Sequence, residues 1–190
     1  MREATVERET SETYVRVSLR LDGSGKVSAE TGLGFFDHML TTLMYYAGFD
    51  GTVEGKEKVW VGGHHVIEDV GLALGEAVRR ALGSSGFARF GEAVTPMDEA
   101  LVLAAVDISG RPRYYGNLPQ GSVAGIPVED LSHFIESLAA TLGASVHVLV
   151  LREGNTHHVV EAAFKSLGRA LGAAVSQFEG VRSLKGTLLG

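Results

Sequence analysis

The chain has 190 residues, 45% hydrophobic and 21% charged, which is typical of one globular domain. Its formal net charge of −6 argues against a nucleic-acid-binding protein, and the lack of cysteine excludes disulfides and thiolate metal sites. No apolar stretch approaches the roughly 20 residues that span a bilayer, so we expect a cytoplasmic protein without a membrane or nucleic-acid partner.

The first half of the chain alternates between strand and helix patterns that end at glycines. Residues 14–21 alternate in polarity and run into Asp-Gly-Ser-Gly, which predicts a strand and a turn. Residues 36–46 predict a short helix closed by Gly48, and residues 51–61 predict two short strands. Residues 66–82 have strong helical periodicity up to Gly83, so we expect a longer helix there.

The second half follows the same order of elements. Apolar residues 101–108 predict a strand that ends at Ser109-Gly110, and residues 113–115 predict a further strand segment. Residues 128–142 predict a helix closed by Gly143. A strand at 146–151 and a helix at 158–175 complete the pattern.

Distinctive residues recur in both halves in the same order. His38 corresponds to His133, and the His-His-x-x-Glu segment at 64–68 corresponds to the one at 157–161. The separation from His38 to His64 is 26 residues, and that from His133 to His157 is 24. This repetition indicates an internal duplication. We predict a single domain over residues 1–190, with similar halves of about 1–92 and 93–190 that pack face to face.

The repeated histidines and glutamates are the ligand types of a divalent metal site. On a helix turning about 100° per residue, the two histidines and the glutamate of each segment point to one side. These ligand types favour zinc, nickel or iron(II) over manganese and do not choose one ion. Two ions with four protein ligands each would use eight residues and keep open positions for substrate: His38, His64, His65, Glu68, His133, His157, His158 and Glu161. The seventh histidine, His147, lies in an alternating strand run and is predicted to be structural or to support a metal ligand without binding the metal.

Seven stretches of the chain together resemble the imidazoleglycerol-phosphate dehydratases. They occupy residues 9–13, 31–40, 64–69, 96–100, 107–112, 157–165 and 183–186, which covers almost the whole chain. The resemblance implies a hydro-lyase of histidine biosynthesis that converts imidazole glycerol phosphate to imidazole acetol phosphate through an imidazolate-type intermediate. It implies two Mn(II) ions per active site, held by the eight ligands above. It also implies an α+β fold, internally duplicated, with the helices of two similar β/α halves packed between two sheets.

The same resemblance implies roles for individual side chains. Glu12 is expected to reach the substrate as a carboxylate, and Lys165 to act on the leaving hydroxyl or hold the phosphate. Lys165 follows His157 by eight residues, about 80° around the helix, and so lies on the metal side. The expected catalytic residues are Glu12, Glu68, Glu161 and Lys165. The expected substrate-binding residues are Glu12, His38, Arg89, Arg111, Lys165, Ser183 and Lys185.

The family also implies a homo-oligomer of 24 subunits with active sites between neighbouring chains. Two other functions fit the residues: a dinuclear metallohydrolase and a non-catalytic shell assembled by metal. A metallohydrolase would usually use several aspartates, and only Asp37 and Asp69 adjoin the histidines. The chain departs from the family pattern at Tyr46, where a histidine is common, and at Gly62-Gly63, where an aspartate precedes the histidine pair. Neither change removes a metal ligand.

Overall fold

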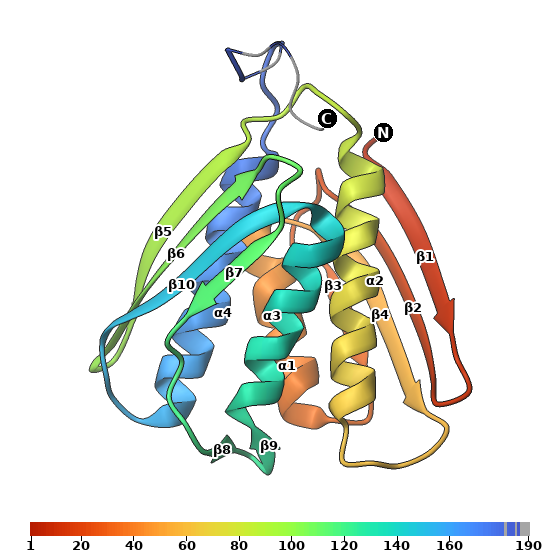
Figure 1. Ribbon diagram of the computed structural model, residues 1–190, viewed down its shortest axis with the longest axis vertical. Coiled ribbons are helices and arrows are strands. Elements are labelled where there is room, and N and C mark those ends of the chain that lie inside the picture. Colours follow the sequence, from red (N-terminus) through yellow and green to blue (C-terminus); the bar gives the residue numbers. More distant parts are fainter. Residues whose placement is uncertain (181, 185, 187–190) are drawn as a thin grey trace.

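Two four-stranded sheets enclose a layer of four helices in the computed structural model, which describes residues 1–180, 182–184 and 186 (Figure 1). The first sheet has the order β1-β2-β4-β3 and the second the order β5-β6-β10-β7. This architecture confirms the expected α+β fold with helices between two sheets. None of the helices in the described residues is long and apolar enough to cross a membrane.

The two sheets have the same topology. The first contains β1 (Glu3–Glu9), β2 (Thr13–Arg20), β3 (Val27–Glu30) and β4 (Asp50–Glu57). The second contains β5 (Phe90–Met97), β6 (Ala100–Ile108), β7 (Arg113–Gly116) and β10 (Ala144–Arg152). In each sheet three strands are antiparallel, and the third strand in chain order pairs parallel to the last. The duplication seen in the histidines therefore extends to the backbone.

Four helices form the layer between the sheets: α1 (Gly34–Ala47), α2 (His64–Leu82), α3 (Val128–Leu142) and α4 (Thr156–Val175). A small hairpin of β8 (Ser122–Val123) and β9 (Ile126–Pro127) precedes α3. All four helices begin at the same end of the molecule, the lower end in Figure 1. Because the histidine pairs lie at the starts of α2 and α4, both are placed at this end.

The helices pack across the two halves, α2 on α3 and α1 on α4. Glycines make these approaches close: a Cβ atom added to Gly75 would lie 2.3 Å from the Leu138 carbonyl oxygen. At the equivalent crossing, a Cβ atom on Gly168 would lie 2.4 Å from the Leu43 carbonyl oxygen. Such distances are well below van der Waals contact, so each crossing requires glycine.

One hydrophobic core joins the halves. Phe134 of α3 makes an edge-to-face contact with Phe36 of α1 and a stacked contact with Phe164 of α4, with ring centroids 5.3 and 5.7 Å apart. All three rings are fully buried. Aromatic packing of this kind adds about 0.5–1.5 kcal/mol per pair beyond the burial of area. These contacts fix α1, α3 and α4 relative to one another.

Several strands were not predicted from the sequence. β1, β3, β5 and the short strands β8 and β9 are absent from the predicted elements, and the two short strands expected in residues 51–61 are one strand, β4, followed by a loop. β5 spans the predicted division near residue 92, and all of its residues pair within the second sheet. The other helices and strands occur where the residue patterns placed them, within a few residues at their ends.

Candidate metal centre

Different caps position the two His-His-x-x-Glu segments. α2 begins at His64 after Gly62 and Gly63, both of which have positive φ, 92° and 91°. A side chain such as aspartate would be strained at either position, so the departure from the family pattern matches the local backbone. α4 has a side-chain cap instead: the amide oxygen of Asn155 accepts a hydrogen bond of 2.9 Å from the backbone NH of His157.

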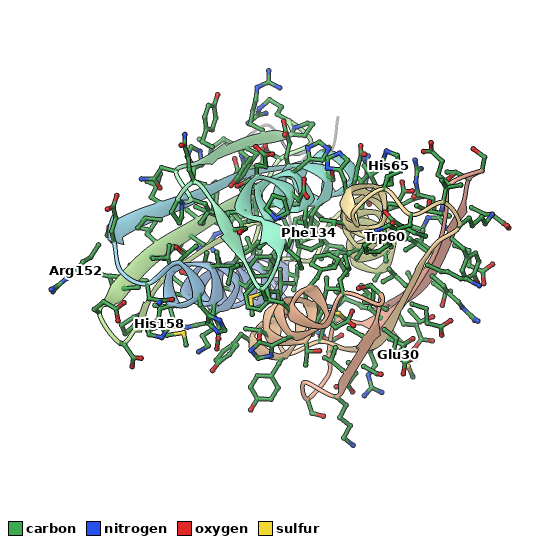
Figure 2. The ribbon with its side chains drawn as sticks, turned by 90° about the horizontal axis from the view of Figure 1, so that it is seen from below. Glu30, Trp60, His65, Phe134, Arg152 and His158 are labelled. Carbon is green, nitrogen blue, oxygen red and sulfur yellow. The ribbon has the colours of Figure 1, made fainter. Side chains whose placement is uncertain are left out.

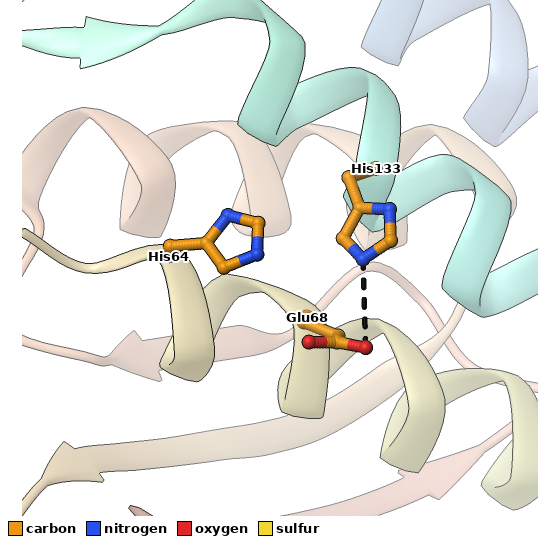
Figure 3. A group of neighbouring side chains, drawn as sticks. All are labelled: His64, Glu68 and His133. Carbon is orange, nitrogen blue, oxygen red and sulfur yellow. Dashed lines mark ion pairs between the residues drawn. The ribbon is translucent and has the colours of Figure 1, made fainter. Parts of the chain in front are cut away.

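One group of three ligands lies between α2 and α3. His64, Glu68 and His133 each offer one ligand atom, and these atoms lie within 4.8 Å of one another (Figure 3). Nε2 of His133 is 3.4 Å from Oε1 of Glu68, and the two imidazole rings are stacked. Two imidazole nitrogens and a carboxylate oxygen around one space fit a divalent cation with room for a further ligand.

Two carboxylates that the sequence did not single out face the far side of these histidines. Nδ1 of His64 is 2.8 Å from Oδ1 of Asp130, and Nδ1 of His133 is 3.5 Å from Oε2 of Glu136. The hydrogen bond to Asp130 raises the pKa of His64. A carboxylate on Nδ1 leaves Nε2 as the metal-binding nitrogen, an arrangement that commonly orients metal ligands.

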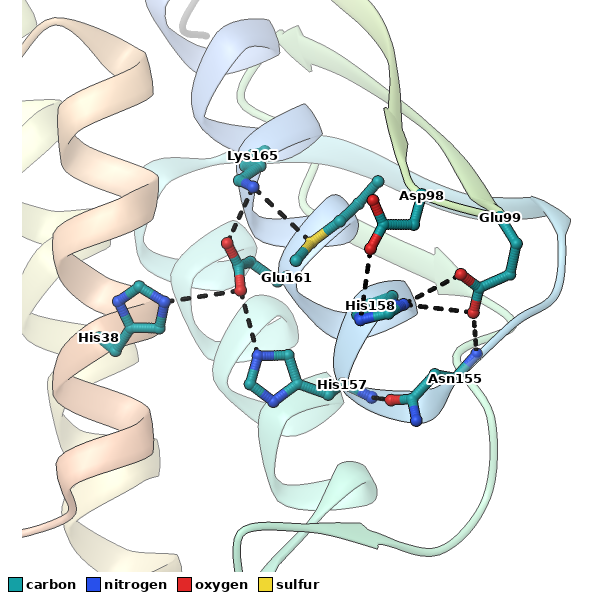
Figure 4. A network of polar contacts seen from close by, with 9 residues as sticks. His38, Asp98, Glu99, Asn155, His157, His158, Glu161 and Lys165 are labelled. Carbon is teal, nitrogen blue, oxygen red and sulfur yellow. Dashed lines mark hydrogen bonds and ion pairs between the residues drawn. The ribbon is translucent and has the colours of Figure 1, made fainter.

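The second group lies between α1 and α4. Oε2 of Glu161 is 3.5 Å from Nε2 of His38 and 3.2 Å from Nε2 of His157 (Figure 4). The other oxygen of Glu161 is 2.8 Å from Nζ of Lys165, as the predicted position of Lys165 on this helix face requires. Burial acts to raise the pKa of Glu161, but the Lys165 ammonium and the two histidines outweigh it, so the pKa is lowered.

The second histidine of each pair turns away from these groups. Nδ1 of His65 is 3.3 Å from Oε2 of Glu12, and Nδ1 of His158 is 3.0 Å from Oε2 of Glu99. His158 also lies 3.6 Å from Asp98. Figure 2 shows His65 and His158 on opposite sides of the helix layer. The eight predicted ligands are therefore not gathered around one space in a single chain, but divided into two groups of three and two separate histidines.

Glu12 and Glu99 occupy equivalent places in the duplicated fold. Glu12 directly precedes β2 in the turn after β1, and Glu99 directly precedes β6 in the turn after β5. The Glu99 carboxylate accepts hydrogen bonds from the backbone NH of Asn155, from the backbone NH of Glu99 itself and from His158. These bonds lower the pKa of Glu99 to about 2. Because neither β1 nor β5 was predicted, the equivalence of the two hairpins is visible only in the structure; the signal for Glu99 in the sequence is its place in the stretch 96–100 that resembles the family.

The two aspartates beside the histidines have structural partners. Asp69 is buried and accepts hydrogen bonds from Arg8 and from the hydroxyl of Thr13, which ties α2 to the β1–β2 hairpin. Asp37 accepts from the backbone NH and the hydroxyl of Thr31. Neither carboxylate faces the ligand groups, which argues against the dinuclear metallohydrolase.

The residues expected to bind phosphate lie at the other end of the helices. The Arg89 guanidinium pairs with Asp107, 2.7 Å from Nε to Oδ1, and donates to the backbone of Arg182, so it lies beside the tail that contains Ser183. The backbone NH of Arg89 bonds to Ala174, which is 13 residues, or about 20 Å, along α4 from Glu161. Arg111 follows β6 at this same end. Lys185 lies outside the described residues.

Comparisons with known proteins agree on one family. The family model described as imidazoleglycerol-phosphate dehydratase matches residues 31–171. The enzyme of that name from Metallosphaera sedula is 49% identical over 95% of this chain and 96% of its own length, and that from Desulfitobacterium hafniense is 45% identical over 99% of both. The solved structure from Pyrococcus furiosus superposes with a TM-score of 0.86 at 40% identity, covering 96% of this chain and all of its own. The Staphylococcus aureus structure has a TM-score of 0.81 at 30% identity, covering 93% and 99%.

Proposed function

The chain belongs to the imidazoleglycerol-phosphate dehydratases, hydro-lyases of histidine biosynthesis, and we propose that it carries out this dehydration with two Mn(II) ions held between neighbouring subunits. The observation that carries the proposal is the pair of ligand groups at the helix starts. The ligand atoms of His64, Glu68 and His133 lie within 4.8 Å of one another, and Glu161 lies 3.5 Å from His38 and 3.2 Å from His157. A cytoplasmic location is part of the proposal and rests on the biosynthetic pathway alone.

Each ligand group needs one more protein ligand to reach the four expected. His65 and His158 lie outside both groups on their own chain, with half-exposed side chains. In an assembly, each would be available to complete a group on a neighbouring subunit. This arrangement would use all six histidines and both glutamates, and still keep coordination positions for substrate and water.

The position of the phosphate-binding residues also supports active sites between chains. The backbone of Arg89 bonds to Ala174, about 20 Å along α4 from Glu161, and this separation is too large for one small substrate to span within a chain. A neighbouring subunit that brings its Arg89 end to the histidine end of this chain would close that distance. Arg89, Arg111, Ser183 and Lys185 would then hold the phosphate with cationic and hydrogen-bonding groups.

One surface of the subunit is suited to such contacts. Val94 of β5, Leu103 of β6 and Leu149 of β10 are paired in one row across the outer face of the second sheet. The outer face of the first sheet carries polar rows instead, such as Thr5, Ser18 and Thr52. An exposed apolar face of this kind usually marks a protein contact. We propose that it contributes to a homo-oligomer of 24 subunits.

The chain supplies the groups that move protons and orient the substrate. The ions, when bound, supply positive charge that stabilises the deprotonated imidazole ring of the substrate. Glu12 reaches the substrate as the carboxylate that transfers the proton, because it is exposed beside His65 and is not one of the six residues in the two ligand groups. Lys165 places an ammonium group on the ligand side of α4, where it can assist the leaving hydroxyl or hold the phosphate.

The test is turnover of imidazole glycerol phosphate by the purified assembly. We expect activity to be lost after removal of metal with a chelator and restored by Mn(II). Activity should rise and fall with the occupancy of the two ligand groups. Metal content measured on the same samples should therefore rise to two ions per chain as activity returns. An assembled sample that holds two ions per chain and gives no turnover would overturn the proposed function.

A further inference from the structure

The duplicated fold allows the two ligand groups to be compared position by position. His133 and His38 are equivalent, as are His64 and His157, and Glu68 and Glu161. The ligating residue types are therefore identical in the two groups. The residues that surround them are not.

The partner of the first histidine differs most clearly. Asp130, three residues before His133, hydrogen-bonds to Nδ1 of His64 at 2.8 Å. Phe35, three residues before His38, is the equivalent residue, and its ring makes an edge contact with His157 at 5.1 Å. A carboxylate fixes the tautomer of His64 and makes its Nε2 a stronger ligand, whereas a phenyl ring does neither.

Two further positions make the His64 group more negative than the His38 group. Glu136, three residues after His133, lies 3.5 Å from Nδ1 of that histidine, and Thr41 takes its place after His38. Lys165, four residues after Glu161, holds one oxygen of that glutamate at 2.8 Å, and Leu72 is in the equivalent place after Glu68.

The surroundings of the two groups thus have opposite electrostatic character. The His64 group has three carboxylates, and within the described part of the chain no lysine or arginine forms an ion pair with Glu68, Asp130 or Glu136. The His38 group has one carboxylate, already paired with an ammonium. The separate histidines reduce this difference but do not remove it. His65 has one neighbouring carboxylate, Glu12, and His158 has two, Glu99 and Asp98, so His158 could bring only one carboxylate more than His65 to the group that it completes.

We propose that the two metal sites have unequal affinities, and that the site built on His64, Glu68 and His133 takes up a divalent cation before the site built on His38, His157 and Glu161. The inference rests on the proposed function for the presence of two ions. A cation gains more from three nearby carboxylates and two oriented imidazoles than from one carboxylate that it shares with Lys165. Site-to-site differences of this kind typically change metal affinity by about 10–100-fold.

A titration of the assembled, chelator-treated protein with Mn(II) tests the affinities. Electron paramagnetic resonance of free Mn(II) should resolve two classes of one ion per chain, about 10-fold or more apart. Two equal sites per chain would overturn the inference and leave the proposed function standing. No Mn(II) binding would overturn both.

The order of filling can be located directly in the unmodified protein. Crystals grown with one equivalent of Mn(II) per chain should show anomalous density at the His64 group. Density at the His38 group, or equal density at both, would overturn the inference.

Variants then assign the cause. Asp130→Asn combined with Glu136→Gln should weaken only the tighter class, by about 10-fold, and Lys165→Leu should strengthen only the weaker class. Glu76→Gln is the matched control, because this exposed carboxylate on α2 pairs with Arg80 away from both groups. If the double variant left the affinity of the tighter class unchanged, or if Lys165→Leu left that of the weaker class unchanged, the electrostatic cause would be refuted.

Discussion

Oε2 of Glu12 lies 3.3 Å from Nδ1 of His65, so the turn between β1 and β2 lies beside the start of α2. The contact places a carboxylate at the edge of a proposed metal site without making it a member of either ligand group. We therefore predict that Glu12→Gln retains both metal ions and the assembly but lowers kcat by about 100-fold or more, as expected on loss of a proton-transfer group. Glu9→Gln, in the same hairpin and paired with Lys58, should retain activity. Loss of metal from Glu12→Gln would show that the carboxylate is a ligand instead.

A second prediction separates the six ligand histidines from the seventh. His133→Ala removes one ligand of the first group and should reduce bound Mn(II) from about two ions per chain to about one. His147→Ala is the control, because His147 stacks on Tyr115 on the outer face of the second sheet, away from both groups. Metal analysis of the dialysed proteins measures both. A His133→Ala protein with a full complement of metal would contradict the ligand assignment.

A third prediction concerns the close crossings of the helices. Gly75→Ala and Gly168→Ala each push a methyl group into a backbone carbonyl of the facing helix, which should lower the free energy of unfolding by about 1–3 kcal/mol. Gly34→Ala is the matched control, since no atom lies within 4 Å of its added Cβ. Urea denaturation compares the three. Equal stabilities would mean that the helices can separate at no cost.

Asp69 provides a fourth test, because its two partners anchor the hairpin that carries Glu12. Asp69→Asn weakens the bonds from Arg8 and Thr13 to a buried carboxylate, and we expect a loss of about 1–3 kcal/mol in the free energy of unfolding. Asp22→Asn is the control: Asp22 also pairs with an arginine, Arg2, but is exposed, so the loss should stay below about 1 kcal/mol. Similar losses in both variants would show that the contacts of Asp69 stabilise the fold no more than an exposed ion pair does.

The fifth prediction is the pH dependence that follows from Glu99. Its pKa of about 2 lies below the ordinary value of 4.5, so the folded state favours the ionised carboxylate. Its contribution to stability is complete above pH 4.5 and is lost as the pH falls towards 2. Glu99→Gln should therefore be less stable than the parent at pH 7, and the difference should shrink between pH 4.5 and pH 2. Glu92→Gln, exposed on β5, should show no such convergence.

The sequence predicted the helices well because their buried faces are apolar with a helical period. It did not predict β5, and the reason is visible in the packing. The inward residues of β5 are small or polar, Gly91, Ala93 and Thr95, because α4 lies so close that a Cβ atom on Gly91 would be 2.0 Å from the Ala170 carbonyl oxygen. The apolar residues Phe90 and Val94 face outwards. A pattern search for buried apolar side chains therefore finds the wrong face.

The sequence predicted which residues belong to the candidate site better than it predicted how they are arranged in space. Ligand types and the duplication identified both His-His-x-x-Glu segments, but helical angles alone placed each histidine pair on one side. In the structure His64 is hydrogen-bonded to Asp130 of α3, and His65 lies beside Glu12 of the β1–β2 hairpin. Such partners are distant in the chain, so the spacing within one helix cannot reveal them.

The crossing of helices between the halves has a consequence for synthesis of the chain. The helices of the first half pack on their own sheet, but the faces of α1 and α2 that pack on α4 and α3 have no partner until the ribosome has made the second half. Assembly of the helix layer must therefore wait for nearly the whole chain, and these exposed faces of the newly made first half are a target for chaperones or for association with another copy. By the same logic, separately expressed fragments divided between Leu82 and Phe90 should recover structure only when mixed.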